Sequence, residues 1–325
     1  MKYLSCRHLE HGIAFFLDDI VTCCISSHEG GGNIKCIPGY FGEPIDWDKF
    51  FAERRKLRDL HKSGQVYEKC KGCYYLTEQE WDDEDYFNEL LIGHWSQCNC
   101  NCIYCYTDED KVYYNTRPFY NLYPVIKDML DKNLIRNGGE IAFGGGEPTI
   151  LPEFEDLLNA FLDHGLNNIR IHSSGIRFSP AIYKGLREGK ITLIISIDSS
   201  TPETYKKIKN KNTFYSVRDN ITRYAQTQGN FLCKYVLTPG VNDTFEEVEK
   251  WLEDCKESKV RYIAFDIEDY WFKANRHNIP QKIYDLFDFV VRNYQHYDIR
   301  NYQLYERAMH LREDRKKRLE NNGGQ

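Results

Sequence analysis

Short apolar runs alternate with amphipathic stretches along residues 88–268, and this alternation limits the fold more than any other feature. Runs of five to eight residues separated by ten to eighteen residues predict strands alternating with helices around a parallel sheet. Strands are expected at 89–95, 139–143, 168–172, 191–198, 231–237 and 260–266. Helices are expected near 118–135, 152–164, 179–188, 214–228, 244–258 and 279–296. Six such units fit an α/β fold, either a partial barrel or an open doubly wound sheet, with the chemistry after the strand ends.

The twelve cysteines are unevenly distributed, because ten of them lie in the first 105 residues. An even spread would suit small buried hydrophobic residues, whereas a concentrated set favours metal sites. The apolar run 13–21 carries Asp18 and Asp19, so we expect no signal peptide. Metal or redox use is therefore favoured over disulfides. Cys233 and Cys255 are expected to be packing residues.

A triplet of cysteines follows the first expected strand. Cys98, Cys102 and Cys105 have the spacing C-x3-C-x2-C, which lets three thiolates converge as an iron–sulfur cluster requires. Three ligands leave one iron of a four-iron cluster open, and an open coordination position is typical of a catalytic metal site. The alternative is a zinc knuckle with Cys100 as fourth ligand, but the C-x-C spacing is cramped for tetrahedral zinc.

The triplet, with the aromatic Tyr104 before its last cysteine, resembles the radical S-adenosylmethionine (SAM) superfamily. At the end of the second expected strand, Gly145, Gly146 and Glu147 precede a proline, which is similar to the GGEP motif of that family. Glycines allow a close approach of the backbone to a ligand, and Glu147 offers a carboxylate to an ammonium group. The resemblance covers about residues 88–268 and implies a partial (β/α)6 TIM-like barrel.

The resemblance implies an enzyme, a radical SAM oxidoreductase. A [4Fe–4S] cluster held by the triplet would cleave SAM reductively, and the 5′-deoxyadenosyl radical would abstract hydrogen from the substrate. Further residues fall where the family contacts SAM, each of them a weak match alone. They are Ser173 and Ser174 after the third strand, Ser196 at the end of the fourth, and Lys234 on the fifth.

The front cysteines resemble a second metal-binding module of the same family. Cys6, one of Cys23 and Cys24, and the Cys70-x2-Cys73 pair follow the order found in SPASM and twitch modules, which hold auxiliary [4Fe–4S] clusters. This chain departs from the pattern in two ways. Asp18 or Asp19 stands where those modules have a glycine before the second cysteine, and the module precedes the core instead of following it. A structural four-thiolate zinc site is the alternative. Cys36 is left as a free buried thiol.

We expect three parts: a small cysteine-rich metal-binding domain at 1–85, the radical SAM core at 86–298 and a polar C-terminal helix or tail at 299–325. The net charge of −6 disfavours nucleic acid, and no apolar run is long enough to span a membrane. An oxygen-sensitive cluster implies a cytoplasmic setting. The expected partners are a flavodoxin- or ferredoxin-type reductant and a peptide or sugar-like substrate, which is expected to be oxidised. The alternative is a non-catalytic iron–sulfur- or zinc-binding interaction protein.

Overall fold

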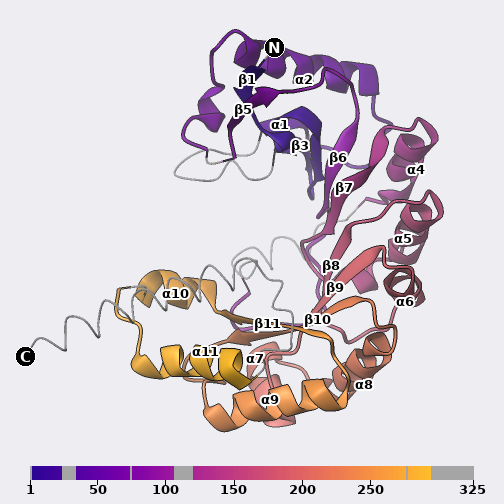
Figure 1. Cartoon of the computed structure of the whole chain (residues 1–325). Coiled ribbons are helices and arrows are strands. Elements are labelled where there is room, and N and C mark those ends of the chain that lie inside the picture. Colours follow the sequence, from indigo (N-terminus) through magenta and orange to yellow (C-terminus); the bar gives the residue numbers. More distant parts are fainter. Residues whose placement is uncertain (1, 24–33, 74, 106–119, 276, 294–325) are drawn as a thin grey trace, which may run out of the picture. The chain divides into compact units, whose positions relative to one another are not determined.

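The computed structural model describes residues 2–23, 34–73, 75–105, 120–275 and 277–293. The chain divides into two compact units. The first unit consists of residues 1–97 and 109–171, and the second of residues 98–108 and 172–325. Helices and mostly parallel strands alternate in both units (Figure 1), which confirms the predicted α/β class.

The first unit contains the strands β1 (Lys2–Ser5), β2 (Gly12–Phe15), β3 (Asp19–Cys23), β4 (Ile34–Pro38), β5 (Thr77–Glu80), β6 (Phe87–Ile92), β7 (Ile135–Phe143) and the start of β8 (Ile169–Ser173). Its helices are α1 (Arg7–His11), α2 (Trp47–Lys62), α4 (Tyr123–Asp131) and α5 (Phe154–Asp163). Two short 3-10 turns, η1 (Glu68–Cys70) and η2 (Pro148–Ile150), complete it.

Strand β6 lies inside the sheet of this unit. It pairs in parallel with β7 and with β2, β8 pairs in parallel with β7, and β3 and β4 continue the sheet antiparallel beyond β2. One face of the sheet is apolar and packs against helices: the ring of Phe143 lies 5.4 Å from that of Phe154 on α5. Because side chains alternate between faces, the opposite face carries Glu89, Leu91 and Glu140.

Two short segments near the start of the chain are paired strands. The apolar stretch at 13–22 forms β2 and β3, joined by a tight turn in which the Phe16 amide donates to the Asp19 carbonyl at 2.9 Å. The acidic run 78–85 begins within β5, which pairs antiparallel with β1. The predicted domain boundary at residue 85 stays a prediction, although β2 and β6 share one sheet across it.

The second unit contains the end of β8 and the strands β9 (Ile191–Ser196), β10 (Asn230–Leu237) and β11 (Tyr262–Ile267). Its helices are α6 (Pro180–Arg187), α7 (Pro202–Lys209), α8 (Phe214–Ala225), α9 (Phe245–Glu257), α10 (Asp269–Asn275) and α11 (Gln281–Asn293). Strand β10 lies between β9 and β11, parallel to both. Packing is aromatic: the rings of Tyr235 and Trp251 lie 4.9 Å apart, as do those of Phe265 and Phe287.

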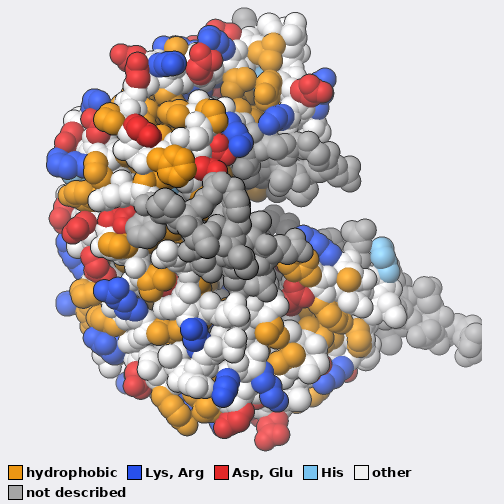
Figure 2. Space-filling view, turned by 180° about the vertical axis from the view of Figure 1, so that it is seen from behind, with side chains coloured by type: hydrophobic (Ala, Val, Ile, Leu, Met, Phe, Trp, Pro, Cys, Tyr) orange, Lys and Arg blue, Asp and Glu red, His pale blue; other side chains and the backbone are white. Residues whose placement is uncertain are grey.

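All six strands predicted for the core are found within a few residues of their expected positions, and α7 and α10 are additional helices. The predicted C-terminal tail at 299–325 lies outside the described residues. None of the described helices is both long and apolar enough to span a membrane. On the face drawn in Figure 2, the described acidic and basic side chains are interspersed.

Candidate functional site

The loop of residues 98–105 carries the predicted cluster ligands and belongs to the second unit. Cys98 is exposed and Cys102 and Cys105 are partly exposed, whereas the side chain of Cys100 is buried. The Cys98 Sγ accepts from the Cys100 amide at 3.4 Å, and the Cys105 amide donates to the Cys102 carbonyl at 3.2 Å. The three thiols of the C-x3-C-x2-C spacing are therefore accessible on this loop, and the fourth is turned inward.

Hydrogen bonds with Cys102 and Cys98, together with burial, raise the pKa of the Cys100 thiol far above its usual range. Its burial distinguishes Cys100 from the three thiols of the C-x3-C-x2-C spacing, which are exposed or partly exposed.

The backbone of this loop is fixed to the end of helix α7. The Asn101 amide donates to the Lys209 carbonyl and the Ile103 amide to the Ile208 carbonyl, both at 3.0 Å. A third anchor lies on the side chain of Asn99, whose Oδ1 accepts from the Ser174 hydroxyl at 2.9 Å. The loop is therefore held along its length by the second unit itself.

Tyr104 adds a buried side-chain anchor. Lys209 Nζ donates to the Tyr104 hydroxyl at 2.7 Å, and both groups donate to Oδ2 of Asp198, which is completely buried. The Asp198 Oδ1 accepts from the Val236 amide on β10 at 2.6 Å. The Asn242 side chain donates to the Asp198 carbonyl at 2.9 Å, so the end of β9, strand β10 and the cysteine loop meet at one carboxylate.

The charges in the group formed by Tyr104, Asp198 and Lys209 keep Lys209 protonated. Burial lowers the pKa of Lys209, but the Asp198 carboxylate outweighs it and holds that pKa well above its usual range. The thiol of Cys102 also acts electrostatically on both Lys209 and Tyr104. A buried positive charge thus lies close to the cysteine loop.

The glycine turn after β7 belongs to the first unit. Gly145 has φ +90°, and a Cβ at Gly146 would lie 2.0 Å from the carbonyl oxygen of Gln97. The Gly146 amide donates to the Trp95 carbonyl at 3.2 Å and the Glu147 amide to the Gln97 carbonyl at 2.8 Å. The glycines were expected to admit a ligand; their contacts in this unit are with the chain segment that leads into the cysteine loop.

Glu147 is buried, and its Oε1 accepts from the amide of Thr149 at 3.2 Å and from its hydroxyl at 2.6 Å. The carboxylate thus caps η2 in this structure. Its predicted contact with an ammonium group stays a prediction.

The remaining predicted SAM contacts lie in the second unit. Ser173 is buried and its hydroxyl accepts from the Gly175 amide at 3.0 Å, while Ser174 holds Asn99. Ser196 and Lys234 are directly opposite one another on β9 and β10. Lys234 Nζ forms an ion pair of 3.2 Å with Asp266 on β11. The register brings Ser196 and Lys234 side by side, and their predicted contacts with SAM stay predictions.

The front thiols gather in the first unit. Cys6, Cys23 and Cys70 are buried in one apolar cluster. Burial, with smaller contributions from the other thiols of the set, Cys73 included, raises the pKa of Cys6 to about 11 and that of Cys70 to about 12. The structure thus brings four predicted ligands near one another. Cys24 lies outside the described residues.

As they are placed, no three or more His, Cys, Asp or Glu side chains in the described part of the chain form a group that could hold a metal ion. Both predicted ligand sets therefore stay predictions. Their donor chemistry fits the expected groups, since thiolates are the ligands of iron–sulfur clusters and of structural zinc.

Sequence reasoning missed Asp198 and Lys209 as site residues. Asp198 follows the predicted site residue Ser196 by two positions, and this proximity was the signal that could have indicated it. Lys209 lies in the basic run KKIKNK, which is typical of a solvated surface, so nothing in the sequence marked it as buried.

The sequence model of the Radical SAM superfamily matches residues 92–255, about half of the chain. A curated relative, GTP 3′,8-cyclase of Haemophilus influenzae, is 26% identical over 178 residues, which are 54% of this chain and 52% of that protein. A probable GTP 3′,8-cyclase of Methanothermobacter thermautotrophicus is 26% identical over 172 residues, 52% of this chain and 53% of that protein. The chain spans about half the length of these curated relatives.

Solved structures resemble the chain more distantly. Streptococcus suis SuiB bound to S-adenosylmethionine superposes with a TM-score of 0.48 and 13% identity, covering 76% of this chain and 54% of that one. Native anSMEcpe with bound AdoMet and Cp18Cys peptide gives a TM-score of 0.47 and 24% identity, covering 65% of this chain and 62% of that one.

Proposed function

The chain belongs to the radical SAM superfamily, and we propose that it is an enzyme that generates a 5′-deoxyadenosyl radical from SAM to abstract hydrogen from its substrate. The observation that carries this proposal is the cysteine loop, with Cys98, Cys102 and Cys105 accessible and Cys100 buried. When bound, the [4Fe–4S] cluster supplies the electron that cleaves SAM.

The residues of this chain bind and orient the reactants. Cys98, Cys102 and Cys105 would hold the cluster, and the pair Lys209 and Asp198 would keep their loop in place. The proposed contacts with SAM are those expected from the sequence. They are Tyr104, Gly145, Gly146, Glu147, Ser173, Ser174, Ser196 and Lys234.

The front thiols would hold a second group, an auxiliary [4Fe–4S] cluster of the SPASM or twitch kind. Its ligands would be Cys6, Cys70, Cys73 and one of Cys23 and Cys24. The shared burial of Cys6, Cys23 and Cys70 supports Cys23 as the fourth ligand. A four-thiolate zinc site uses the same residues and is the alternative.

The proposed reaction is an oxidation of a peptide or a sugar-like small molecule, because an auxiliary cluster would accept the second electron. Because curated relatives are named GTP 3′,8-cyclases, GTP is a further candidate substrate to be tested. The proposed setting is the cytoplasm, with a flavodoxin- or ferredoxin-type protein as reductant.

The test is anaerobic reconstitution with iron and sulfide, followed by dithionite and SAM, with 5′-deoxyadenosine measured by mass spectrometry. We expect 5′-deoxyadenosine from the unaltered chain and none from Cys102→Ala. Cys100→Ala is the matched control, since it alters the same loop without removing a proposed ligand, and it should retain the product. A non-catalytic metal-binding protein would bind iron in all three samples and form no 5′-deoxyadenosine in any.

Metal analysis tests the front site separately. Cys70→Ala should lower the iron content by about half while the Cys98–Cys105 cluster remains, and Cys36→Ala should leave it unchanged. Zinc in the purified chain that Cys70→Ala removes would favour the structural site and overturn the auxiliary cluster.

A further inference from the structure

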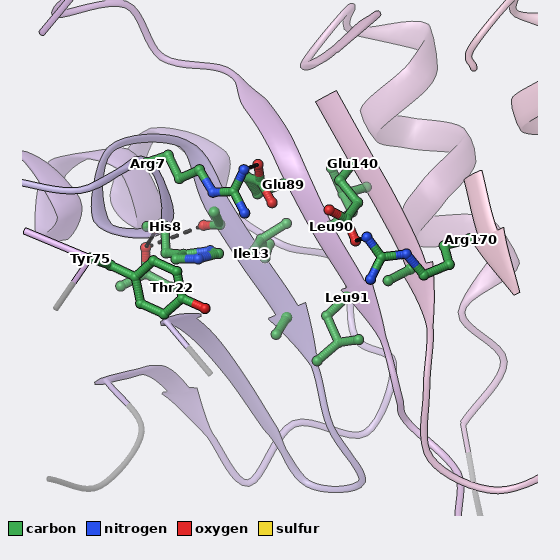
Figure 3. Close-up of a pocket in the computed structure, with 13 residues that line it drawn as sticks. Arg7, His8, Ile13, Thr22, Tyr75, Glu89, Leu90, Leu91, Glu140 and Arg170 are labelled. Carbon is green, nitrogen blue, oxygen red and sulfur yellow. Dashed lines mark hydrogen bonds and ion pairs between the residues drawn. The ribbon is translucent and has the colours of Figure 1, made fainter. Parts of the chain in front are cut away.

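A cavity of about 270 Å³ opens on the sheet of the first unit, between helix α1 and strands β2, β6 and β7. It is lined by residues with no role in the proposed cluster or SAM contacts (Figure 3). Cavities that hold drug-sized ligands measure roughly 300–1,000 Å³, so this one suits a smaller molecule.

Two rows of side chains form its floor. Strand register places Gly12, Glu89 and Glu140 in one row across β2, β6 and β7. The adjacent row, two residues further along each strand, is Ala14, Leu91 and Ala142. Since residues two apart share a face, the cavity has a polar row beside an apolar one.

The polar row places two carboxylates directly opposite one another, which is unfavourable unless cations balance them. An arginine flanks each carboxylate: Arg7 lies 3.3 Å from Glu89, and Arg170 lies 2.6 Å from Glu140. Figure 3 shows the two carboxylates between the two guanidinium groups. The side chains of Arg7 and Arg170 are 54% and 46% exposed, those of Glu89 and Glu140 only 14% and 21%. Negative charge therefore lies inside the cavity, and the more exposed positive charge lies at its rim.

His8 gives independent support for a ligand. Its side chain is 8% exposed, lines the cavity, and its Nε2 has no hydrogen-bond partner. In Figure 3 the imidazole points toward Ile13 in the interior of the cavity. Buried polar atoms are rarely left unsatisfied, so a bound molecule with a polar group is the natural partner of this nitrogen.

We propose that this cavity binds a small zwitterion, with its ammonium group between Glu89 and Glu140, its carboxylate at Arg170, and an aliphatic stem along Leu91. The four charged side chains sum to zero, so an occupant with one charge of each sign preserves the balance, whereas a purely cationic or anionic one does not. The class is that of free amino acids.

The apolar row connects this cavity with the glycine turn. The Cδ1 atom of Leu91 lies 3.3 Å from where a Cβ would stand on Gly144, immediately before the predicted SAM-binding glycines. Resting on the proposed function, the inference therefore narrows the substrate to a zwitterion of amino-acid type.

The test is isothermal titration of the reconstituted full chain without reductant, using L-alanine, L-leucine and 5-aminopentanoate as probes. The probe that binds most tightly is then compared with its own carboxamide and its own N-acetyl derivative, each of which lacks one of the two charges. The dissociation constant of each derivative should be at least roughly tenfold higher than that of the probe. Glu140→Gln and Arg170→Gln should weaken that probe by a similar factor. The exposed Glu78→Gln is the matched control and should not.

Absence of saturable binding for all three probes, or equal binding of a singly charged derivative, overturns the inference. The derivative series needs no variant, so it decides the question even if Glu140→Gln fails to fold. 5′-Deoxyadenosine formation is measured on the same preparation without any probe. Binding without cleavage would contradict the proposed function alone, and cleavage without binding would contradict only the zwitterion site.

Discussion

Lys209 Nζ donates a hydrogen bond of 2.7 Å to the hydroxyl of Tyr104, the residue immediately before the last cysteine of the proposed cluster loop. Both groups share the buried carboxylate of Asp198. Because all three side chains come from the same unit as the loop, the loop is positioned by charges of the chain itself. The ligand loop is thus preorganised.

Removing the cation should destabilise the second unit. Lys209→Met leaves Asp198 buried without its cation, which costs about 3–5 kcal/mol in comparable buried pairs. Urea unfolding of the chain prepared without iron measures this loss. The exposed Lys207→Met on the same helix is the control and should change the free energy of unfolding little.

The double variant Lys209→Met with Asp198→Asn distinguishes an unpaired charge from lost packing. It removes both charges, so it should unfold at a higher urea concentration than Lys209→Met alone. A double variant that is less stable than the single one would show that the ion pair is not what the loop depends on.

The backbone anchors predict slow amide exchange. Asn101 and Ile103 donate to carbonyls at the end of α7, so their amide hydrogens should exchange more slowly than those of an unstructured peptide, even without a cluster. Hydrogen–deuterium exchange with mass spectrometry measures this on the wild-type chain and on Lys209→Met, in which exchange should accelerate. Exchange at free-peptide rates in the wild-type chain would contradict a preorganised loop.

The glycine turn should tolerate a side chain at one position and not at another. Gly146→Ala would place a Cβ 2.0 Å from the Gln97 carbonyl oxygen, so the backbone must move, at a cost of about 1–3 kcal/mol. At Gly144 the nearest atom is a flexible Leu91 methyl at 3.3 Å, so Gly144→Ala is the matched control. Equal unfolding midpoints in urea for the two variants would show that the approach to Gln97 is not required.

His11 predicts a stability that falls in mild acid. Burial lowers its pKa to about 4; nearby Asp82 opposes this shift, and Arg58 and Arg54 reinforce it. The unfolded chain, with an ordinary histidine pKa near ~6.5, binds the proton more readily, so the free energy of unfolding decreases as pH falls from about 6.5 toward 4.

His11→Phe keeps an aromatic ring against Tyr86, on which His11 stacks at 4.0 Å, and should flatten this part of the pH dependence in urea unfolding. The exposed His164→Phe should retain the slope of the wild-type chain. An unchanged slope in His11→Phe would assign the acid sensitivity to other groups.

The core was predictable because its strands are continuous apolar runs that differ sharply from the helices between them. Helix α7, with the sequence PETYKKIK, was not predictable. Only Tyr205, Ile208 and Lys209 are buried in it, so its apolar residues show little helical periodicity. The burial of Lys209 depends on Asp198, eleven residues away and on a different element. Spacing within a single segment does not reveal such a pair.

The sequence indicated candidate site residues where they are consecutive, as in the cysteine triplet and the glycine turn, and their roles stay predictions. The site was not predictable where strand pairing determines proximity. Glu89 and Glu140 are opposite one another only through the register of β6 and β7, and Gly12 joins their row only because β2 pairs with β6. No local pattern predicts which strands become neighbours.

The central claim is that three sulfurs of the loop hold a cluster with one iron open to SAM. Low-temperature electron paramagnetic resonance of the reduced, reconstituted Cys100→Ala chain, with and without SAM, tests it most directly. We predict a cluster signal that shifts on addition of SAM, as in the wild-type chain, and loss of that SAM-responsive signal in Cys98→Ala, Cys102→Ala and Cys105→Ala. Loss of the signal in Cys100→Ala, or a spectrum that SAM leaves unchanged, would contradict the account.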